Sequence, residues 1–121
     1  MLDMFPKWEY FIDRNVGTWY LRSLMRIISR KVLVDFYQSH PDSKRSLEAW
    51  FHEVSQGKWK TPADVKLEYP SASILKKGRV VFNIRGNKYR LAVKVMYATG
   101  AVYVRFIGTH NKYNQIDAEV I

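Results

Sequence analysis

The chain has 121 residues, 47% of them hydrophobic and 15% aromatic, so we expect one folded domain rather than a disordered chain. It contains no cysteine, which excludes disulfides and thiolate chemistry, and no apolar run approaches the roughly 20 residues of a membrane-spanning helix. The 20 Lys and Arg against 11 Asp and Glu give a formal net charge of +9, which favours nucleic acid as partner over an anionic membrane surface.

Residues 1–24 are rich in aromatic side chains and end just before a second methionine, Met25. Their cations and carboxylates cancel, so the whole formal charge lies in residues 25–121. The segment from Met25 onward is sufficient for a domain, and we expect residues 1–24 to be a loosely attached extension without a catalytic part, or an upstream start read through. The first residues lack the basic-then-apolar order of a signal peptide, so a cytoplasmic protein is expected.

Residues 26–28 are predicted to form a short strand. A helix over about residues 30–39 comes next, with Ser29 as its N-cap. Its apolar side chains share one helical face: Val32, Leu33, Phe36 and Tyr37.

A second helix is predicted over about residues 43–56, capped by Asp42 or Ser43 and ended by Gly57. Its apolar stripe has helical spacing and consists of Leu47, Trp50, Phe51 and Val54. The two helical stripes are expected to cover the apolar face of a sheet.

Thr61 as a cap and Pro62 at the first helical position predict a short third helix, which stops before Pro70. Residues 71–77 are expected to add a strand that turns at Gly78 into the main sheet.

Residues 79–113 read as three strands joined by two tight turns. The first turn is centred on Gly86 and Asn87, which tolerate positive φ, so that Arg85 faces Lys88. The second turn spans residues 97–100, so that Met96 faces Ala101.

This register sorts the side chains onto two faces, because strand residues alternate. One face is apolar: Val80, Phe82, Ile84, Tyr89, Leu91, Val93, Val95, Val102, Val104 and Phe106. The other face carries Arg79, Asn83, Arg85, Lys88, Arg90, Lys94, Tyr103 and Arg105, with Val81, Ala92, Met96 and Ile107 among them. Six cations without a carboxylate on one sheet face indicate a polyanionic partner.

Thr109 can cap a final short helix that carries His110, Tyr113 and Ile116. The predicted fold is therefore α+β, an antiparallel sheet with two N-terminal helices packed on one face and a short C-terminal helix.

Several enzyme classes do not fit these residues. No serine lies in a nucleophile-elbow pattern, and His40, His52 and His110 show no metal-ligand spacing. Carboxylates are too scattered for a two-metal nuclease, and no glycine-rich phosphate loop is present. We expect neither a metal nor a cofactor.

The chemistry that remains is a metal-free attack by the RNA's own 2′-hydroxyl on the adjacent phosphodiester. Such a site needs a base, an acid and cations that stabilise the charge building on phosphorus. Arg90 and Arg105 lie on the polar face of adjacent strands, and the register puts Arg105 opposite Ala92, one pleat from Arg90. Both guanidinium groups are then within reach of one phosphate, although a pair of solvated surface arginines fits the pattern equally well.

His110 and Tyr113 lie just past the strand that delivers Arg105. His110 can transfer a proton near neutral pH, and a structural role at the helix start is an equal alternative. Tyr113 can donate a proton or stack on a base. Tyr103 can stack on a base or pack on its neighbours. Lys58 and Lys60 flank Trp59, a pattern more typical of a loop anchor than of a binding site.

The segments VVFNIRGNKYRLAVKV, VYVRFIGTHNKY and GKWKTPADVKLEYPSAS resemble the HigB family of bacterial toxins, within the RelE superfamily. The resemblance begins at Met25 and leaves residues 1–24 outside. It implies a cytoplasmic, ribosome-associated mRNA endoribonuclease, as monomer or in a hetero-oligomer with a HigA-type helix-turn-helix antitoxin. Carried onto this sequence, it points to Arg90, Arg105, His110 and Tyr113 as catalytic residues. It points less firmly to Arg79, Asn83 and Lys88.

Two other functions remain open. A non-catalytic RNA- or ribosome-binding module, or an inactive toxin, would carry the same basic sheet. A DNA-binding role is less favoured, because no helix has a base-reading pattern.

Overall fold

The computed structural model describes residues 10–13, 18–21 and 25–121 of the chain, with side chains from Met25 onward. Strands β1 (Tyr10–Asp13) and β2 (Thr18–Leu21) pair antiparallel as a separate two-stranded sheet. The expected loose attachment of residues 1–24 falls mostly outside the described residues and stays a prediction.

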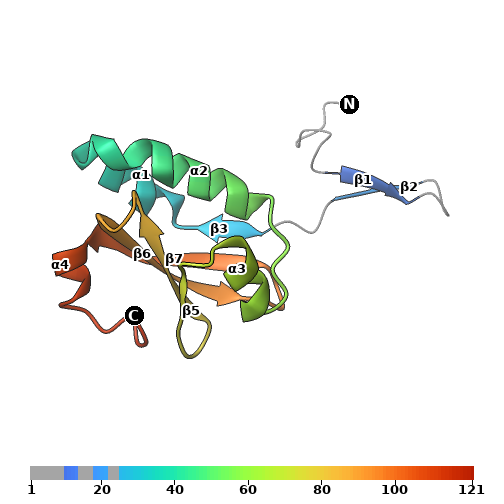
Figure 1. Ribbon diagram of the computed structural model, residues 1–121. Helices are drawn as coiled ribbons and strands as arrows, with labels where there is room; N and C mark the ends of the chain where they lie inside the picture. Colours follow the sequence, from blue (N-terminus) through green and yellow to red (C-terminus); the bar gives the residue numbers. More distant parts are fainter. Residues whose placement is uncertain (1–9, 14–17, 22–24) are drawn as a thin grey trace.

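From Met25 the chain forms one α+β unit around a five-stranded sheet in the order β3-β7-β6-β5-β4. Its elements are β3 (Arg26–Ile28), α1 (Arg30–Ser39), the 3₁₀ helix η2 (Pro41–Ser43), α2 (Lys44–Ser55), α3 (Pro62–Glu68), β4 (Ser73–Ile74), β5 (Arg79–Ile84), β6 (Tyr89–Met96), β7 (Ala101–Thr109) and α4 (His110–Tyr113). Only β3 runs parallel to its neighbour, β7. Figure 1 shows α1 and α2 together on one face of the sheet and α4 at the end of β7. The predicted fold is confirmed. Among the described residues, no helix is long and apolar enough to cross a membrane.

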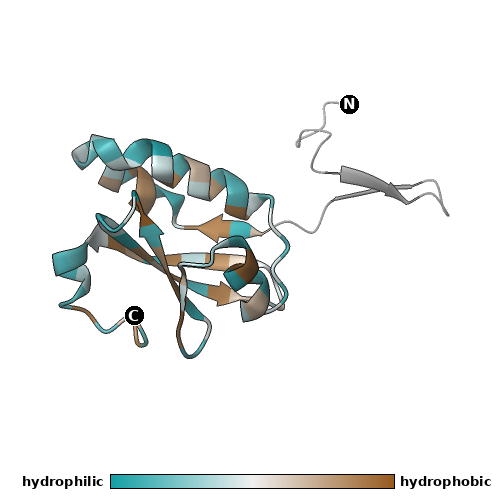
Figure 2. Cartoon of the chain, viewed as in Figure 1, coloured by the Kyte–Doolittle hydropathy of each residue, from teal (hydrophilic) through white to brown (hydrophobic). Residues whose placement is uncertain are grey.

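The core lies between the sheet and the two N-terminal helices, as predicted. Leu33 of α1 and Trp50 of α2 are buried against strand residues such as Phe82, whose ring centroid is 5.4 Å from that of Trp50. Figure 2 shows the apolar colour on the strands and the polar colour on the outer surfaces of α1 and α2. Val32, which was expected in the stripe of α1, is 41% exposed and lies at its edge.

The predicted N-cap positions of the first two helices, Ser29 and Ser43, are confirmed, but neither side chain makes the capping hydrogen bond. Ser29 adopts a left-handed conformation (φ 74°) and makes no side-chain cap bond. Ser43 instead donates its hydroxyl to the carbonyl of His40 at 2.7 Å, and the carboxylate of Asp42 is taken by side chains of the β5–β6 hairpin. The predicted cap at Thr61 is confirmed, with Asp64 completing a capping box.

The register of the sheet agrees with the prediction until the middle of β7. Arg79 pairs with Lys94 across the first turn, and Met96 pairs with Ala101 across the second. A β-bulge then shifts the pairing, so that Ala92 faces Phe106 and Arg105 is the extra residue. The expectation that Arg105 faces Ala92 is therefore wrong.

The bulge exchanges the faces of the next two residues. Phe106 was expected in the core, but it packs on Val81 and Ala92 on the outward face. Ile107 was expected outside, but it packs against the core. Every residue after Arg105 is thus turned over relative to a regular strand.

Candidate nucleic-acid interface

The outward face of the sheet is not a continuous field of cations. Its centre is apolar, with Val81 2% and Ala92 0% exposed. These two residues are covered by the C-terminal part of the chain and its neighbours: Leu75, Phe106, Tyr113, Ala118 and Ile121. The cations predicted for this face consequently stand around an apolar centre.

Arg90 lies beside this centre, and neighbouring side chains hold its guanidinium. It pairs with Asn83 on β5, and its Nη1 donates to Asn83 Oδ1. Its guanidinium carbon lies 5.8 Å from the centroid of the Tyr113 ring. Its Nε is buried and has no hydrogen-bond partner among the described residues. Because an unpaired buried donor costs about 1–3 kcal/mol, this placement is not explained by stability.

Helix α4 carries both predicted proton-transfer residues and brings one of them, Tyr113, to Arg90. Thr109 caps it, as predicted, by accepting from the backbone N–H of Lys112 at 3.3 Å. His110 is exposed at its first position. Tyr113 is half-buried and packs on Phe106, with ring centroids 6.2 Å apart. Since α4 begins directly after β7, the bulge in β7 decides the side of the sheet on which Tyr113 lies.

Arg105 belongs to a second cluster. It is exposed in the bulge, and its guanidinium carbon lies 5.3 Å from the centroid of Tyr103. Tyr103 pairs with Lys94 across the sheet. Arg90 and Arg105 therefore stack on different rings. The register that was expected to bring them together is not formed, so their joint action on one phosphate stays a prediction.

Arg79 is tied to the end of the chain. Its Nε and Nη2 donate to the carbonyl oxygen of Ile121 at 3.2 and 2.8 Å. The guanidinium thus holds the C-terminal segment that covers the apolar centre. If Arg79 also binds RNA, it does so in addition to this structural contact.

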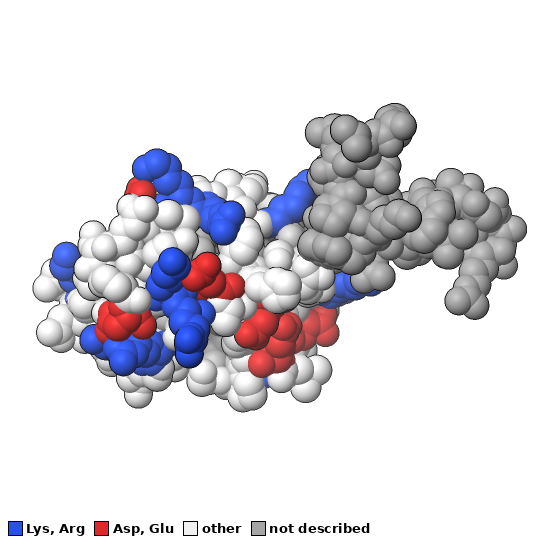
Figure 3. Space-filling model, turned by 90° about the horizontal axis from the view of Figure 1, so that it is seen from above, with Lys and Arg blue, Asp and Glu red and all other residues white. Residues whose placement is uncertain are grey.

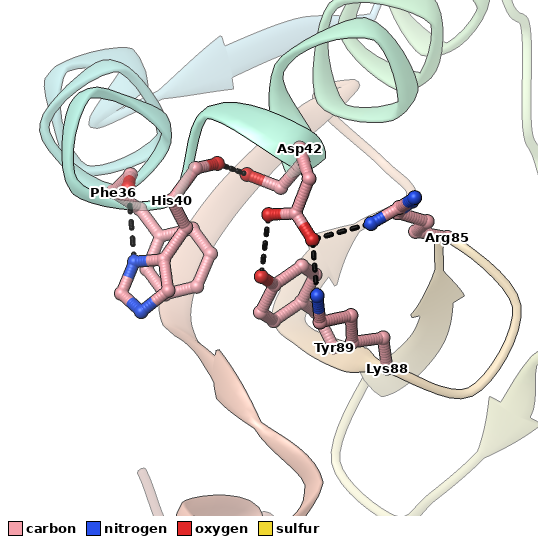
Figure 4. A network of polar contacts seen from close by, with 7 residues as sticks. Phe36, His40, Asp42, Arg85, Lys88 and Tyr89 are labelled. Atoms are coloured by element: carbon pink, nitrogen blue, oxygen red, sulfur yellow. Dashed lines mark hydrogen bonds and ion pairs between the residues drawn. The ribbon is translucent and has the colours of Figure 1, made fainter.

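Two further cations of the predicted surface meet a carboxylate that the sequence suggests only as a helix cap. Arg85 and Lys88, from the β5–β6 turn, donate to Asp42 Oδ2, and Tyr89 Oη donates to Oδ1 at 2.6 Å (Figure 4). The hydrogen bonds from Lys88 and Tyr89 hold the pKa of Asp42 well below its usual value of 3.8. The hydrogen bond to Asp42 in turn raises the pKa of Lys88. We call this group the Asp42 clamp.

The remaining candidates lie away from the outward face. Trp59 is buried, donates its indole N–H to Glu68 at 2.8 Å and stacks near Phe82, so it is an anchor for its loop. Lys58 and Lys60 beside it are exposed.

The helix side of the molecule has a different electrostatic character. Figure 3 shows Lys and Arg interspersed with Asp and Glu on this side. Residues 79–113, by contrast, hold no Asp or Glu. This difference in charge favours the sheet side as the surface that meets a phosphate backbone.

The described residues include no group of three His, Asp or Glu side chains placed to hold a metal ion.

Comparisons with known proteins identify the family of the chain. A family model described as HigB toxin, RelE-like toxic component of a toxin–antitoxin system, matches residues 43–116. The chain is 30% identical over 92 residues to the mRNA interferase toxin HigB of Escherichia coli K12, which covers 74% of this chain and 88% of that protein. The mRNA interferase HigB of Shigella flexneri matches with the same identity and coverage.

The matched span contains Asn83, Arg90, Arg105, His110 and Tyr113, and it ends before Ala118. It also covers three of the four described α-helices and four of the five strands in the main sheet. The chain therefore belongs to the HigB family of RelE-like toxins.

Proposed function

We propose that the chain is an mRNA endoribonuclease that acts on the translating ribosome. The observation that carries the proposal is Arg90, a half-buried cation held by Asn83 and covered by Tyr113, at the edge of a sheet face whose strands hold no carboxylate. The names of the relatives as mRNA interferases support the same substrate.

The reaction is attack by the 2′-hydroxyl on the adjacent phosphorus without a metal ion. The bond between the 2′-oxygen and phosphorus forms, the bond to the 5′-oxygen breaks, and a 2′,3′-cyclic phosphate remains. Arg90 and Arg105 stabilise the charged phosphorane. His110, exposed at the start of α4, and the neighbouring Tyr113 take the 2′ proton, give one to the leaving 5′-oxygen or orient the base.

Other polar residues bind the RNA chain in this proposal: Arg79, Arg85, Lys88, Lys94 and Tyr103 from the sheet and its first turn, and Lys58 and Lys60 from the loop around Trp59. The ribosome supplies the remaining constraint by holding the messenger in a cleavable geometry. As a member of a toxin–antitoxin family, the protein has an antitoxin as partner, for which we propose a HigA-type helix-turn-helix protein. The proposed location is the cytoplasm.

Induced expression in a bacterial host tests this function. Wild type is compared with Arg90→Ala and His110→Ala, and growth is monitored together with cleavage sites in messenger RNA. We expect arrest and cleavage within coding sequence for wild type, and a loss of both in the two variants, because one transition-state donor contributes about 10²–10³-fold in rate.

Two other outcomes are informative. Normal growth with folded, well-expressed wild type contradicts the nuclease function and leaves a binding module or an inactive toxin. Arrest that survives both substitutions keeps the nuclease and contradicts the assigned site.

A further inference from the structure

Asn83 lies directly opposite Arg90 in the pairing of β5 with β6. Its Oδ1 accepts a hydrogen bond from Arg90 Nη1, while its Nδ2 lies 3.5 Å from the carbonyl oxygen of Ser71. The amide therefore has an acceptor turned toward the arginine and a donor turned toward the neighbouring loop. Both ends of Asn83 are engaged within the protein.

The guanidinium of Arg90 is constrained on its other sides as well. Its Nε is buried, and the ring of Tyr113 lies over the group at 5.8 Å. Because Nε is enclosed and Nη1 donates to Asn83, a phosphate can accept hydrogen bonds only from the remaining N–H groups of the two terminal nitrogens. The direction of these hydrogens is set by the hydrogen bond to Asn83.

We propose that Asn83 is a positioning residue that fixes the guanidinium of Arg90 for the transition state and does not itself bind RNA. The inference rests on the nuclease function proposed above and changes the role expected for Asn83 from the sequence. A fixed donor needs no reorganisation when charge develops on the phosphorane, whereas a guanidinium that rotates freely does.

A double-mutant cycle separates positioning from RNA contact. Asn83→Leu, Arg90→Ala and the double variant are compared with wild type in single-turnover cleavage of messenger on purified ribosomes. Leucine keeps the branched shape and the number of heavy atoms of the side chain and removes both the acceptor and the donor. Gln38→Leu, which removes an exposed amide on α1, is the control and is expected to cleave at the wild-type rate.

We expect Asn83→Leu to lower the cleavage rate by about 10²-fold and to leave the half-saturating ribosome concentration within about twofold. The double variant should be no slower than Arg90→Ala, because Asn83 acts through Arg90. Losses that multiply in the double variant, or a loss that appears in the half-saturating concentration instead of the rate, would show that Asn83 contacts RNA itself and overturn the proposal.

A second measurement does not depend on cleavage. The order parameter of the Arg90 Nε–H bond is measured by NMR in wild type and Asn83→Leu, with the exposed Arg105 as internal reference. In Asn83→Leu the order parameter should be lower than in wild type for Arg90 and unchanged for Arg105. An unchanged value contradicts positioning even when activity is lost. If wild type fails to cleave RNA, the nuclease function fails, and the order parameter still decides whether Asn83 fixes Arg90. Should Asn83→Leu not fold, Asn83→Ala replaces it in both measurements.

Discussion

Gly108 shows how closely the residues around Arg90 are fitted. It pairs with Arg90 across β6 and β7, and the ring of Phe106 lies over it. A Cβ atom at position 108 would be 2.6 Å from Phe106 Cζ and 3.1 Å from its Cε2. The absence of a side chain at this position therefore leaves room for the ring against which Tyr113 packs.

Gly108→Ala is expected to lower the free energy of unfolding by about 1–3 kcal/mol, the usual range for overpacking a filled site. It should also slow RNA cleavage, because a displaced Phe106 moves Tyr113 away from Arg90. Urea unfolding and the single-turnover cleavage rate measure the two effects.

The companion variant is Phe106→Leu, which removes the ring that the new methyl group would meet. In the double variant the loss of stability should be smaller than the sum of the two single losses. Strictly additive losses would mean that the alanine is accommodated without contact with Phe106.

At the scale of elements, the Asp42 clamp joins η2 to the turn between β5 and β6. It connects the helical layer with the hairpin that carries Asn83 and Arg90. Because the pKa of Asp42 is lowered in the folded protein, the clamp stabilises the fold fully above 3.8, the ordinary pKa of the group. That contribution is lost progressively as the pH falls from there toward the lowered folded pKa.

Asp42→Asn should consequently destabilise the protein at pH 6 and have a smaller effect at pH 3, where wild type has begun to lose the same contribution. Urea unfolding of both proteins at the two pH values gives the comparison. Asp35→Asn is the matched control, since Asp35 bonds Lys31 on the exposed surface of α1. A loss of equal size at both pH values for Asp42→Asn would contradict the ionic origin of the clamp.

The elements themselves were largely predictable from local pattern. Alternation and turn residues gave β5, β6 and the first half of β7 in the correct register, and helical spacing gave α1 and α2. The bulge was not predictable, because Val102, Val104 and Phe106 continue a regular apolar alternation. It is favoured by tertiary packing instead: Phe106 covers Gly108, and Ile107 reaches the core.

The candidate site was predictable only in part for the same reason. Arg90 and Tyr113 come together as the expected polar face and C-terminal helix suggest. The hydrogen bond from Arg90 to Asn83 could have been found, since the predicted register pairs these two residues. The Asp42 clamp and the cover formed by Ala118 and Ile121 depend on contacts between distant segments, for which local periodicity carries no signal.

At the scale of the whole molecule, charge is unevenly distributed. Residues 25–121 carry the full formal charge of +9, and the helix side mixes both signs, as Figure 3 shows. The cations of the outward sheet face have no carboxylate on their own strands. RNA is therefore expected to approach this side, guided by a field that salt screens.

Lys94→Ala should weaken RNA binding and reduce the slope of log affinity against log salt concentration by about 0.7, the value for one phosphate contact on a single strand. Cleavage at saturating RNA should be retained. Lys31→Ala, on α1, removes the same charge from the helix side and serves as the control. Equal changes in the two variants would mean that net charge alone, and not the sheet face, governs binding.

The bulge at Arg105 also has a consequence for how this chain can diverge. A substitution in β7 changes one side chain, but loss of one residue between Val104 and Phe106 would return the rest of the strand to regular alternation. Phe106 would turn inward, Ile107 outward, and α4 would leave the strand in the opposite phase. We therefore expect insertions or deletions in this strand to disturb the fold and the candidate site more than substitutions at its exposed positions.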